Sequence, residues 1–286
     1  MSSPRPPASA PSSSITPREM RCKCASRTGY SLNAPASFCR ASVAQSYFMG
    51  RALSSRPTSC YSLSMKKLIL ASASPRRQRL VAWLGVPYEV EPSSVQEELA
   101  DDQDGPSVAR RLALEKARQV AARHREEDCL TLGFDTVVAL EGRLLGKPAG
   151  KREAASMLRS LSSRAHKVTT GVAVVECATA LSYSFAHTTE VRMKELGERD
   201  IERWLQTEEA LGCAGAYNIE RHLAAVDEDE CFQNVAGLPL CHLYLVLKER
   251  FRVPVAPPRS PCERARDTRC ELGARLLDKD GCEEAS

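Results

Sequence analysis

The 286-residue sequence lacks the long apolar run that a membrane-spanning helix needs. Such a helix takes about 20 consecutive, mostly apolar residues, and no stretch of this chain approaches that length. The sequence therefore predicts no membrane partner. Hydrophobic residues still make up 43% of the chain, so its central part can bury an ordinary core.

Several common site motifs are also missing. The sequence has no Gly-x-x-x-x-Gly-Lys-Ser/Thr, no Gly-x-Gly-x-x-Gly after a strand and no Gly-x-Ser-x-Gly, which excludes the usual phosphate loop, dinucleotide fold and serine hydrolase. The twelve cysteines include no Cys-x-x-Cys pair, and the five histidines are scattered without metal-ligand spacing. We interpret the cysteines of the central part as reduced, mostly buried thiols of a cytoplasmic protein.

Residues 1–64 differ in composition from the rest of the chain. They contain eight basic residues against one acid, Glu19, among many serines and prolines, and should not fold alone. Two interpretations stay open, a disordered leader or an untranslated stretch before a start at Met65, and a targeting segment is a third. Because this stretch carries more than the whole net charge of +4, the remainder is net acidic, and no nucleic-acid partner is predicted.

Apolar periodicity begins near residue 65 and stops near 255, which predicts one domain over 65–255. From Ala256 onward, prolines and alternating charges predict a disordered, charged tail over 256–286. Within the domain, the patterns predict strands at 68–71, 129–140, 143–145, 166–176 and 183–193, and helices at 75–84, 108–120, 151–161, 198–206 and 238–250. Strands that alternate with helices and include a hairpin at 141–142 predict an α/β domain on a mixed sheet.

A pair of arginines stands at the start of the first predicted helix. Arg76 and Arg77 follow Pro75 in the first helical turn, where the helix dipole disfavours cations unless an anion is bound. Free backbone N–H groups, the hydroxyl of Ser72 and two guanidinium groups could converge there on a phosphate chain. The alternative is that both arginines are solvated surface residues.

An acid and a lysine flank the predicted hairpin. Asp135 lies in an apolar strand, where a carboxylate is disfavoured unless it binds a cation or takes a proton. Lys147, in Gly-Lys-Pro, follows the hairpin closely enough to reach the same site. Taken singly, Asp135 could equally be a structural hydrogen-bonding residue and Lys147 an exposed turn residue. Asn218, Asn234 and Gly237 are most simply turn residues.

Taken in order, six segments resemble the Maf family of nucleoside triphosphate pyrophosphatases over about 67–253. They are Leu-Ala-Ser-Ala-Ser-Pro-Arg-Arg at 70–77, Asp-Thr-Val-Val at 135–138, Gly-Lys-Pro at 146–148, His-Lys-Val-Thr-Thr-Gly-Val at 166–172, Ala-Gly-Ala-Tyr at 214–217 and Asn-Val-Ala-Gly-Leu-Pro at 234–239. The resemblance implies an elongated mixed β-sheet flanked by helices, with a nucleotide cleft between two lobes. It also implies hydrolysis between the α- and β-phosphates with a divalent cation, Mg²⁺ or Mn²⁺, and a homodimer.

The resemblance also implies roles for individual residues. Asp135 matches the general base that orients or deprotonates the attacking water. Glu97 matches an acid that helps Asp135 to hold the metal, although this chain has Ser-Val-Gln-Glu where the family often has Asp-Val-Asp-Glu, and Glu98 could serve instead. The remaining positions, which would bind the triphosphate, are Ser72, Arg76, Arg77, Lys116 and Lys147.

Base preference depends on three further matches. The family places an arginine, a threonine and usually a glutamine at positions 76, 136 and 220 when dTTP and UTP are preferred, and this chain has Arg76, Thr136 and Glu220. An ionised glutamate accepts hydrogen bonds but cannot donate them, and the branch that prefers 7-methyl-GTP looks similar here. We favour dTTP, UTP or modified pyrimidine nucleotides. The alternatives are 7-methyl-GTP or another non-standard nucleotide, a non-catalytic nucleotide sensor linked to cell division, or a structural module without a site.

Overall fold

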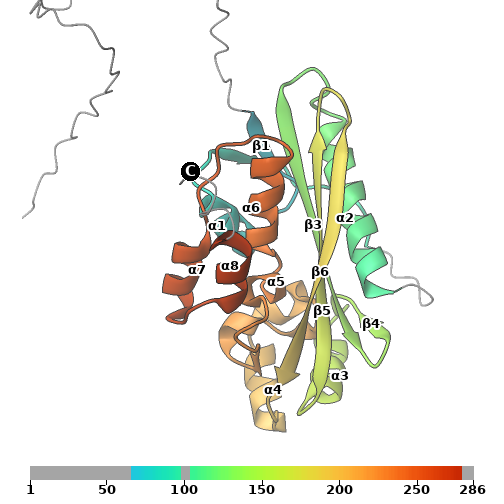
Figure 1. Ribbon diagram of the computed structural model, residues 1–286. Coiled ribbons are helices and arrows are strands. Elements are labelled where there is room, and N and C mark those ends of the chain that lie inside the picture. The colour runs from blue at the N-terminus through green and yellow to red at the C-terminus, as the bar shows by residue number, and fades with distance from the viewer. Residues whose placement is uncertain (1–65, 98–103, 279–286) are drawn as a thin grey trace, which may run out of the picture. The chain divides into compact units, whose positions relative to one another are not determined.

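The computed structural model describes residues 66–97 and 104–278, and Figure 1 shows their arrangement. The interpretations of residues 1–64, and the candidate Glu98, lie outside these ranges. A mixed sheet forms the centre of the described part, as the sequence predicted, and it has seven strands instead of the five that were predicted. No helix in the described ranges is long and apolar enough to cross a membrane.

The sheet combines parallel and antiparallel pairs. Its strands are β1 (Lys67–Leu70), β2 (Tyr88–Val90), β3 (Cys129–Leu140), β4 (Arg143–Leu145), β5 (Ala165–Glu176), β6 (Ser182–Met193) and β7 (Ala224–Ala225). They lie in the order β2, β1, β3, β5, β6, β7, and β4 pairs with the end of β3. β1 runs parallel to β2 and β3, whereas the other pairs are antiparallel. The predicted hairpin of β3 and β4 is confirmed.

Helices pack on both faces of the sheet. They are α1 (Pro75–Ala82), α2 (Gly105–Ala121), α3 (Lys151–Leu161), α4 (Glu198–Leu205), α5 (Phe232–Val235), α6 (Leu240–Glu249), α7 (Arg259–Arg266) and α8 (Glu271–Leu277). Three short 3-10 helices, at Glu208–Gly212, Ala214–Ala216 and Ile219–Arg221, connect α4 to β7. Alternate residues of β1 face opposite layers, because Leu68 and Leu70 pack with α1 and α6 while Ile69 packs with α2.

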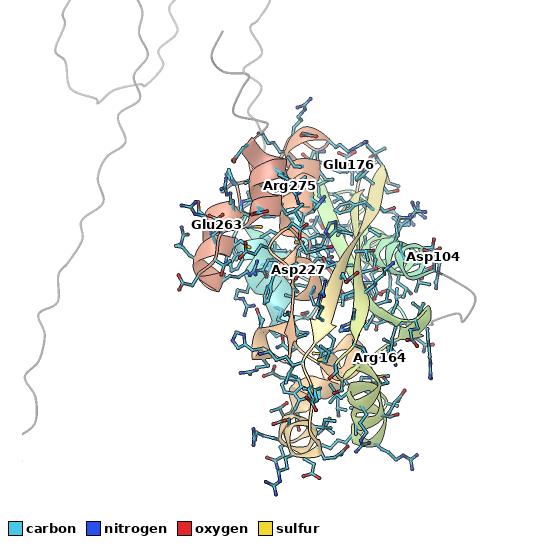
Figure 2. All side chains as sticks on the ribbon, turned by 60° about the horizontal axis from the view of Figure 1, so that its bottom comes forward. Asp104, Arg164, Glu176, Asp227, Glu263 and Arg275 are labelled. Atoms are coloured by element: carbon cyan, nitrogen blue, oxygen red, sulfur yellow. The ribbon has the colours of Figure 1, made fainter. Side chains whose placement is uncertain are left out.

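Helix α2 lies unusually close to the sheet, and two glycines explain why. A Cβ atom on Gly133 of β3 would come within 2.2 Å of the carbonyl oxygen of Ala113, and one on Gly171 of β5 within 2.0 Å of that of Ala109. Only glycine allows the helix backbone to rest directly on the strands. Asp104 caps the start of α2 by accepting a hydrogen bond from the Ser107 N–H at 2.9 Å (Figure 2). This packing brings the middle of α2 against the middle of β3.

Several local expectations differ from the structure. The Gly-Phe-Asp-Thr segment at 133–136 predicted an interruption of the strand at 129–140, but β3 continues through it because Asp135 and Thr136 pair with Gly171 and Thr170 of β5. The first helix ends at Ala82, two residues earlier than predicted. The prediction of a disordered tail is wrong for the described residues after 256, which form α7 and α8. Cys262 and Cys270 are buried there, and α8 packs against α6. The tail is rich in charge, but its buried cysteine side chains give it contacts with the rest of the domain.

Candidate active site

A cavity of about 460 Å³ opens where the end of β1 meets the middle of β3. Eight of the side chains that the sequence singled out line this cavity: Ser72, Arg76, Arg77, Glu97, Lys116, Asp135, Thr136 and Lys147. They come from the β1–α1 turn, the segment after β2, α2, β3 and the segment after β4. The structure thus gathers residues that lie far apart in the sequence into one site.

Arg77 is the most firmly held of the cationic side chains. Its guanidinium group donates to the carbonyl oxygen of Gly237 and to Thr136 Oγ1, both at 3.0 Å, and to Ser72 Oγ at 3.4 Å. The guanidinium also lies 5.8 Å from the ring centroid of Phe134. Burial lowers the pKa of Arg77, and the carboxylates of the cavity oppose this effect. The alternative of a fully solvated surface arginine is therefore wrong.

Arg76 turns toward the other side of the cavity. Its two terminal nitrogens lie 3.4 and 3.3 Å from the sulfur of Cys213, and its Nε atom is buried without a hydrogen-bond partner in the described residues. A thiol is a weak acceptor, so this guanidinium keeps most of its hydrogen-bonding capacity. Cys213 was not predicted as a site residue, because an isolated cysteine carries no signal of a neighbour 137 positions away.

Two carboxylates meet at the ammonium group of Lys116. Asp135 is only 4% exposed and Lys116 only 6%, and Asp135 Oδ1 lies 2.5 Å from Lys116 Nζ. Glu97 Oε1 accepts from the same nitrogen at 2.7 Å, and both of its oxygens accept from Lys147 Nζ at 2.7 Å. Burial raises the pKa of Glu97, but the two lysines outweigh it and lower that pKa to about 2.

The same carboxylates are oxygen ligands of the kind that a hard divalent cation prefers. Glu97 and Asp135 both reach one nitrogen, so their oxygens converge on a small volume that a cation could occupy after Lys116 shifts. Mg²⁺ commonly binds through one or two carboxylates and completes its shell with substrate phosphates and water. In the described ranges no group of three or more His, Cys, Asp or Glu side chains is arranged to hold a metal.

A buried polar network supports the arginine clamp from behind. Thr136 Oγ1 lies 2.9 Å from Thr170 Oγ1, which donates to the backbone oxygen of Asn234 at 2.9 Å. The amide of Asn234 donates to Val168 O at 3.0 Å and to Thr189 Oγ1 at 3.1 Å. Asn234 is fully buried, so its interpretation as a simple turn residue misses that it fastens α5 to β5 and β6.

A second buried pair holds an aromatic ring at the cavity. The hydroxyl of Tyr217, which lines the cavity, lies 2.7 Å from His166 Nε2 on β5. Burial lowers the pKa of His166 to about 4, so the imidazole is neutral at pH 7. The sequence predicted no histidine site. Because side chains alternate along a strand, His166 lies on the same side of β5 as Val168 and Thr170.

Among the described residues, Glu220 is the one predicted site residue that does not line the cavity. It lies in the 3-10 helix Ile219–Arg221, where its carboxylate pairs with Arg79 of α1. Its neighbours Asn218 and Ile219 do line the cavity. Glu220 therefore lies at the rim of the cavity, next to these two residues, and its carboxylate is paired with Arg79.

The fold and this site together define an α/β protein with a cavity lined by four cationic side chains and two carboxylates. Comparison with known proteins gives the family. Residues 67–250 match the family model described as Maf-like protein, and the chain belongs to that family. The resemblance found in the six sequence segments is thereby confirmed.

Curated relatives agree with this assignment. The chain is 38% identical over 193 residues to a protein of Alkaliphilus oremlandii, and the aligned region covers 66% of this chain and 98% of that protein. It is 41% identical over 187 residues to one of Pelotomaculum thermopropionicum, covering 65% and 97%. With a protein of Halalkalibacterium halodurans the identity is 42% over 187 residues, covering 64% and 96%. All three relatives carry the name dTTP/UTP pyrophosphatase.

Proposed function

We propose that this chain hydrolyses nucleoside triphosphates to the monophosphate and pyrophosphate. The observation that carries the proposal is a buried carboxylate, Asp135, facing the same cavity as four cationic side chains. A binding site for an anion has no need of a buried acid, whereas a site that activates water beside a phosphate chain does. The names of the three relatives support the same reaction.

The cationic side chains bind the phosphate chain in this proposal. Arg77 is already oriented by three hydrogen bonds, so little side-chain entropy is lost when it meets a phosphate oxygen. The first turn of α1 adds free backbone N–H groups and the positive end of the helix dipole. Lys147, which is half exposed, exchanges its contact with Glu97 for the phosphates.

Asp135 accepts the proton of the attacking water. Its position in the middle of β3, paired on one side with Gly171 of β5, fixes its backbone. Oδ1 lies 2.5 Å from Lys116 Nζ and would bind the cation once Lys116 turns to the phosphates, which leaves Oδ2 to orient a water molecule toward the α-phosphate. General base catalysis of this kind contributes roughly 10²- to 10⁴-fold to a rate.

A divalent cation, Mg²⁺ or Mn²⁺, is part of the proposal, with Glu97 and Asp135 as its protein ligands. When bound, such a cation neutralises charge on the phosphate oxygens and on the leaving pyrophosphate. Glu97 suits this role because its carboxylate, with a pKa of about 2, is ionised throughout the physiological range.

We further propose dTTP and UTP as the preferred substrates. Arg76 and Thr136 lie in the cavity and can read the base or its attached sugar, and the three relatives bear the names of these nucleotides. Glu220 and its partner Arg79 lie outside the cavity lining, so Glu220 would contact a base only from the rim. A cytoplasmic location is also part of the proposal, because all described cysteines are free thiols. A homodimer rests on the family resemblance alone.

Pyrophosphate release by the full chain tests the reaction. The assay uses Mg²⁺ and a panel of dTTP, UTP, the other standard triphosphates and 7-methyl-GTP, with Asp135→Asn as the test variant. Glu176→Gln, at the far end of β5, is the matched control (Figure 2). We expect the wild type and the control to release pyrophosphate, with Asp135→Asn slower by about 10²- to 10⁴-fold.

Other outcomes select the alternatives. Fastest turnover of 7-methyl-GTP would refute the pyrimidine preference but keep the reaction. Absence of pyrophosphate with every nucleotide would refute the enzyme. In that case, nucleotides that raise the melting temperature would favour a sensor, because a ligand at 100 times its dissociation constant stabilises by about 2.7 kcal/mol. An unchanged melting temperature would favour a structural module.

A further inference from the structure

Residues 91–97 lead from the end of β2 to the cavity without belonging to the sheet. The Glu91 N–H donates to the Leu70 carbonyl oxygen of β1 at 3.1 Å. For the residues that follow it up to Glu97, the described part of the chain shows no backbone-to-backbone hydrogen bond. This segment nevertheless delivers the Glu97 carboxylate to the cavity. Side-chain contacts must therefore determine its path.

Helix α2 contacts segment 91–97 through one line of polar side chains. Three residues spaced by three and four positions share one side of the helix and of the turn that continues it. Each pairs with one residue of the segment: Lys116 with Glu97, Gln119 with Ser94 and Arg123 with Glu91. The order along the helix is the reverse of the order along the segment. The two therefore run antiparallel and are joined at three points.

The middle contact holds two parts of the same residue. Gln119 Oε1 accepts from the Ser94 N–H at 2.7 Å, and Gln119 Nε2 donates to Ser94 Oγ at 3.0 Å. Because hydrogen bonds are directional, this pair fixes the orientation of the segment as well as its distance from α2. Ser93, Val95 and Glu97 line the cavity, whereas Ser94 does not. Alternate residues of the segment thus serve the cavity and the helix.

The contact nearest β2 anchors the start of the segment. One oxygen of Glu91 accepts from Arg123 Nη1 at 2.6 Å, and the other lies 2.6 Å from His124 Nε2. Such exposed charge pairs contribute little to stability. They do, however, fix one end of the short chain section that leads to Ser94, so the contact with Gln119 is not isolated.

The contact at Glu97 differs from the other two, because its lysine partners are also needed elsewhere. Lys116 and Lys147 both donate to this carboxylate at 2.7 Å. In the proposed function both lysines turn to the phosphate chain, and Glu97 then loses the partners that position it. Ser94 precedes it by three residues, a reach of at most about 10 Å. A fixed Ser94 therefore keeps Glu97 beside the cavity.

We propose that Gln119 is a positioning residue, which holds Glu97 at the cavity through Ser94 while the lysines bind the phosphate chain. This inference rests on the proposed function, because a bound nucleotide is what draws the lysines away. Gln119 does not line the cavity, so it acts through Ser94. Without nucleotide the lysines also hold Glu97. The contribution of Gln119 to the position of that carboxylate is therefore largest in the nucleotide complex.

Binding of Mn²⁺ to the full chain tests this role separately from turnover. Electron paramagnetic resonance measures the affinity in the presence of the α,β-imido analogue of dTTP, for Gln119→Ala and for the control Arg118→Ala. Arg118 is the next residue of α2, but it contacts Ser182 of β6 instead of the segment. Loss of two hydrogen bonds in Gln119→Ala should weaken Mn²⁺ binding about tenfold, while the control binds like the wild type. Alanine is the best helix former, so neither variant should disturb α2.

A conservative variant and hydrogen exchange give two further readouts. Gln119→Glu should recover Mn²⁺ binding, because its carboxylate can accept from both the N–H and the O–H of Ser94. Hydrogen exchange of the nucleotide-free chain reports on the segment directly. A peptide that covers 92–97 should exchange faster in Gln119→Ala than in Arg118→Ala, since the Ser94 N–H loses its acceptor, and Gln119→Glu should restore the slow exchange.

The outcomes separate this inference from the proposed function. Equal Mn²⁺ affinity in Gln119→Ala and Arg118→Ala, or equal exchange of 92–97, would overturn the positioning role. A wild type that binds Mn²⁺ and the analogue, but releases no pyrophosphate from any nucleotide, would refute the reaction and leave the positioning role standing. A wild type that binds neither would refute both.

Discussion

Replacement of Asn234 by alanine should weaken both the fold and substrate binding. The side-chain amide donates to the backbone of β5 at Val168 and to Thr189 of β6, in a fully buried position. Alanine removes both bonds and leaves the Val168 carbonyl oxygen without this donor. Thr189 keeps its bond to the Cys231 carbonyl, so it loses less.

The size of the effect can be worked out from these contacts. An unsatisfied buried acceptor costs about 1–3 kcal/mol, and loss of a second, compensated hydrogen bond costs about 0.5–1.5 kcal/mol. The free energy of unfolding should therefore fall by about 1.5–4.5 kcal/mol. For a domain of this size each kcal/mol lowers the melting temperature by about 2–4 °C, so the decrease should lie between about 3 and 18 °C.

Kinetics separate a role in positioning from one in stability alone. Asn234 holds the segment whose Gly237 carbonyl accepts from Arg77, so the variant should bind triphosphate less well and raise KM about tenfold, or about 1.4 kcal/mol. The control Gln206→Ala, an exposed amide at the end of α4, should change neither quantity. A melting temperature within 2 °C of the wild type, or an unchanged KM at a temperature where the variant is folded, would refute this reasoning.

Three further outcomes are expected from the site and its surroundings. Lys147→Ala should raise KM more than it lowers kcat, since its half-exposed ammonium binds phosphate without touching Asp135; an equal loss in both would contradict this. Removal of divalent cations by a chelator should abolish pyrophosphate release, and Mg²⁺ or Mn²⁺ should restore it. Burial lowers the pKa of both His166 and His187 to about 4. The unfolded chain therefore binds more protons between about pH 6.5 and 4, and stability should fall as pH decreases through that window. Thermal unfolding across this range checks the sign, with a flat profile as the contrary result.

The sheet could be predicted because its strands carry strong local signals. The apolar runs at 68–71 and 129–140 and the alternation over 183–193 reappear as strands close to the predicted bounds, and the Glu-Gly turn joins β3 to β4. The three-residue β2 was missed, since it forms by pairing with β1 and not from a pattern of its own. α7 and α8 were missed for a related reason. Their buried side is made largely of cysteine, and its partners are the distant α5 and α6.

Within the site, the ordered family segments indicated the cationic residues and Asp135, but not how they are supported. The bonds from Arg77 to Gly237 and from Thr170 to the Asn234 backbone join positions 160 and 64 residues apart. The spacing of apolar residues along the sequence gives no information about hydrogen bonds between such distant positions. The position of Glu220 was also beyond reach, because its neighbour Arg79 lies on a different helix and 141 residues away.

The charges of the cavity explain why metal and substrate should bind together. Arg76, Arg77, Lys116 and Lys147 face Glu97 and Asp135, an excess of two positive charges. A triphosphate carries roughly four negative charges at neutral pH, and a divalent cation reduces this to about two. Without nucleotide, Lys116 satisfies both carboxylates and competes with a metal ion for them. An arriving phosphate chain offers Lys116 another partner, which frees both carboxylates at the moment when the cation can also coordinate phosphate oxygens. The metal ion is therefore expected to enter with the nucleotide and to bind weakly in its absence.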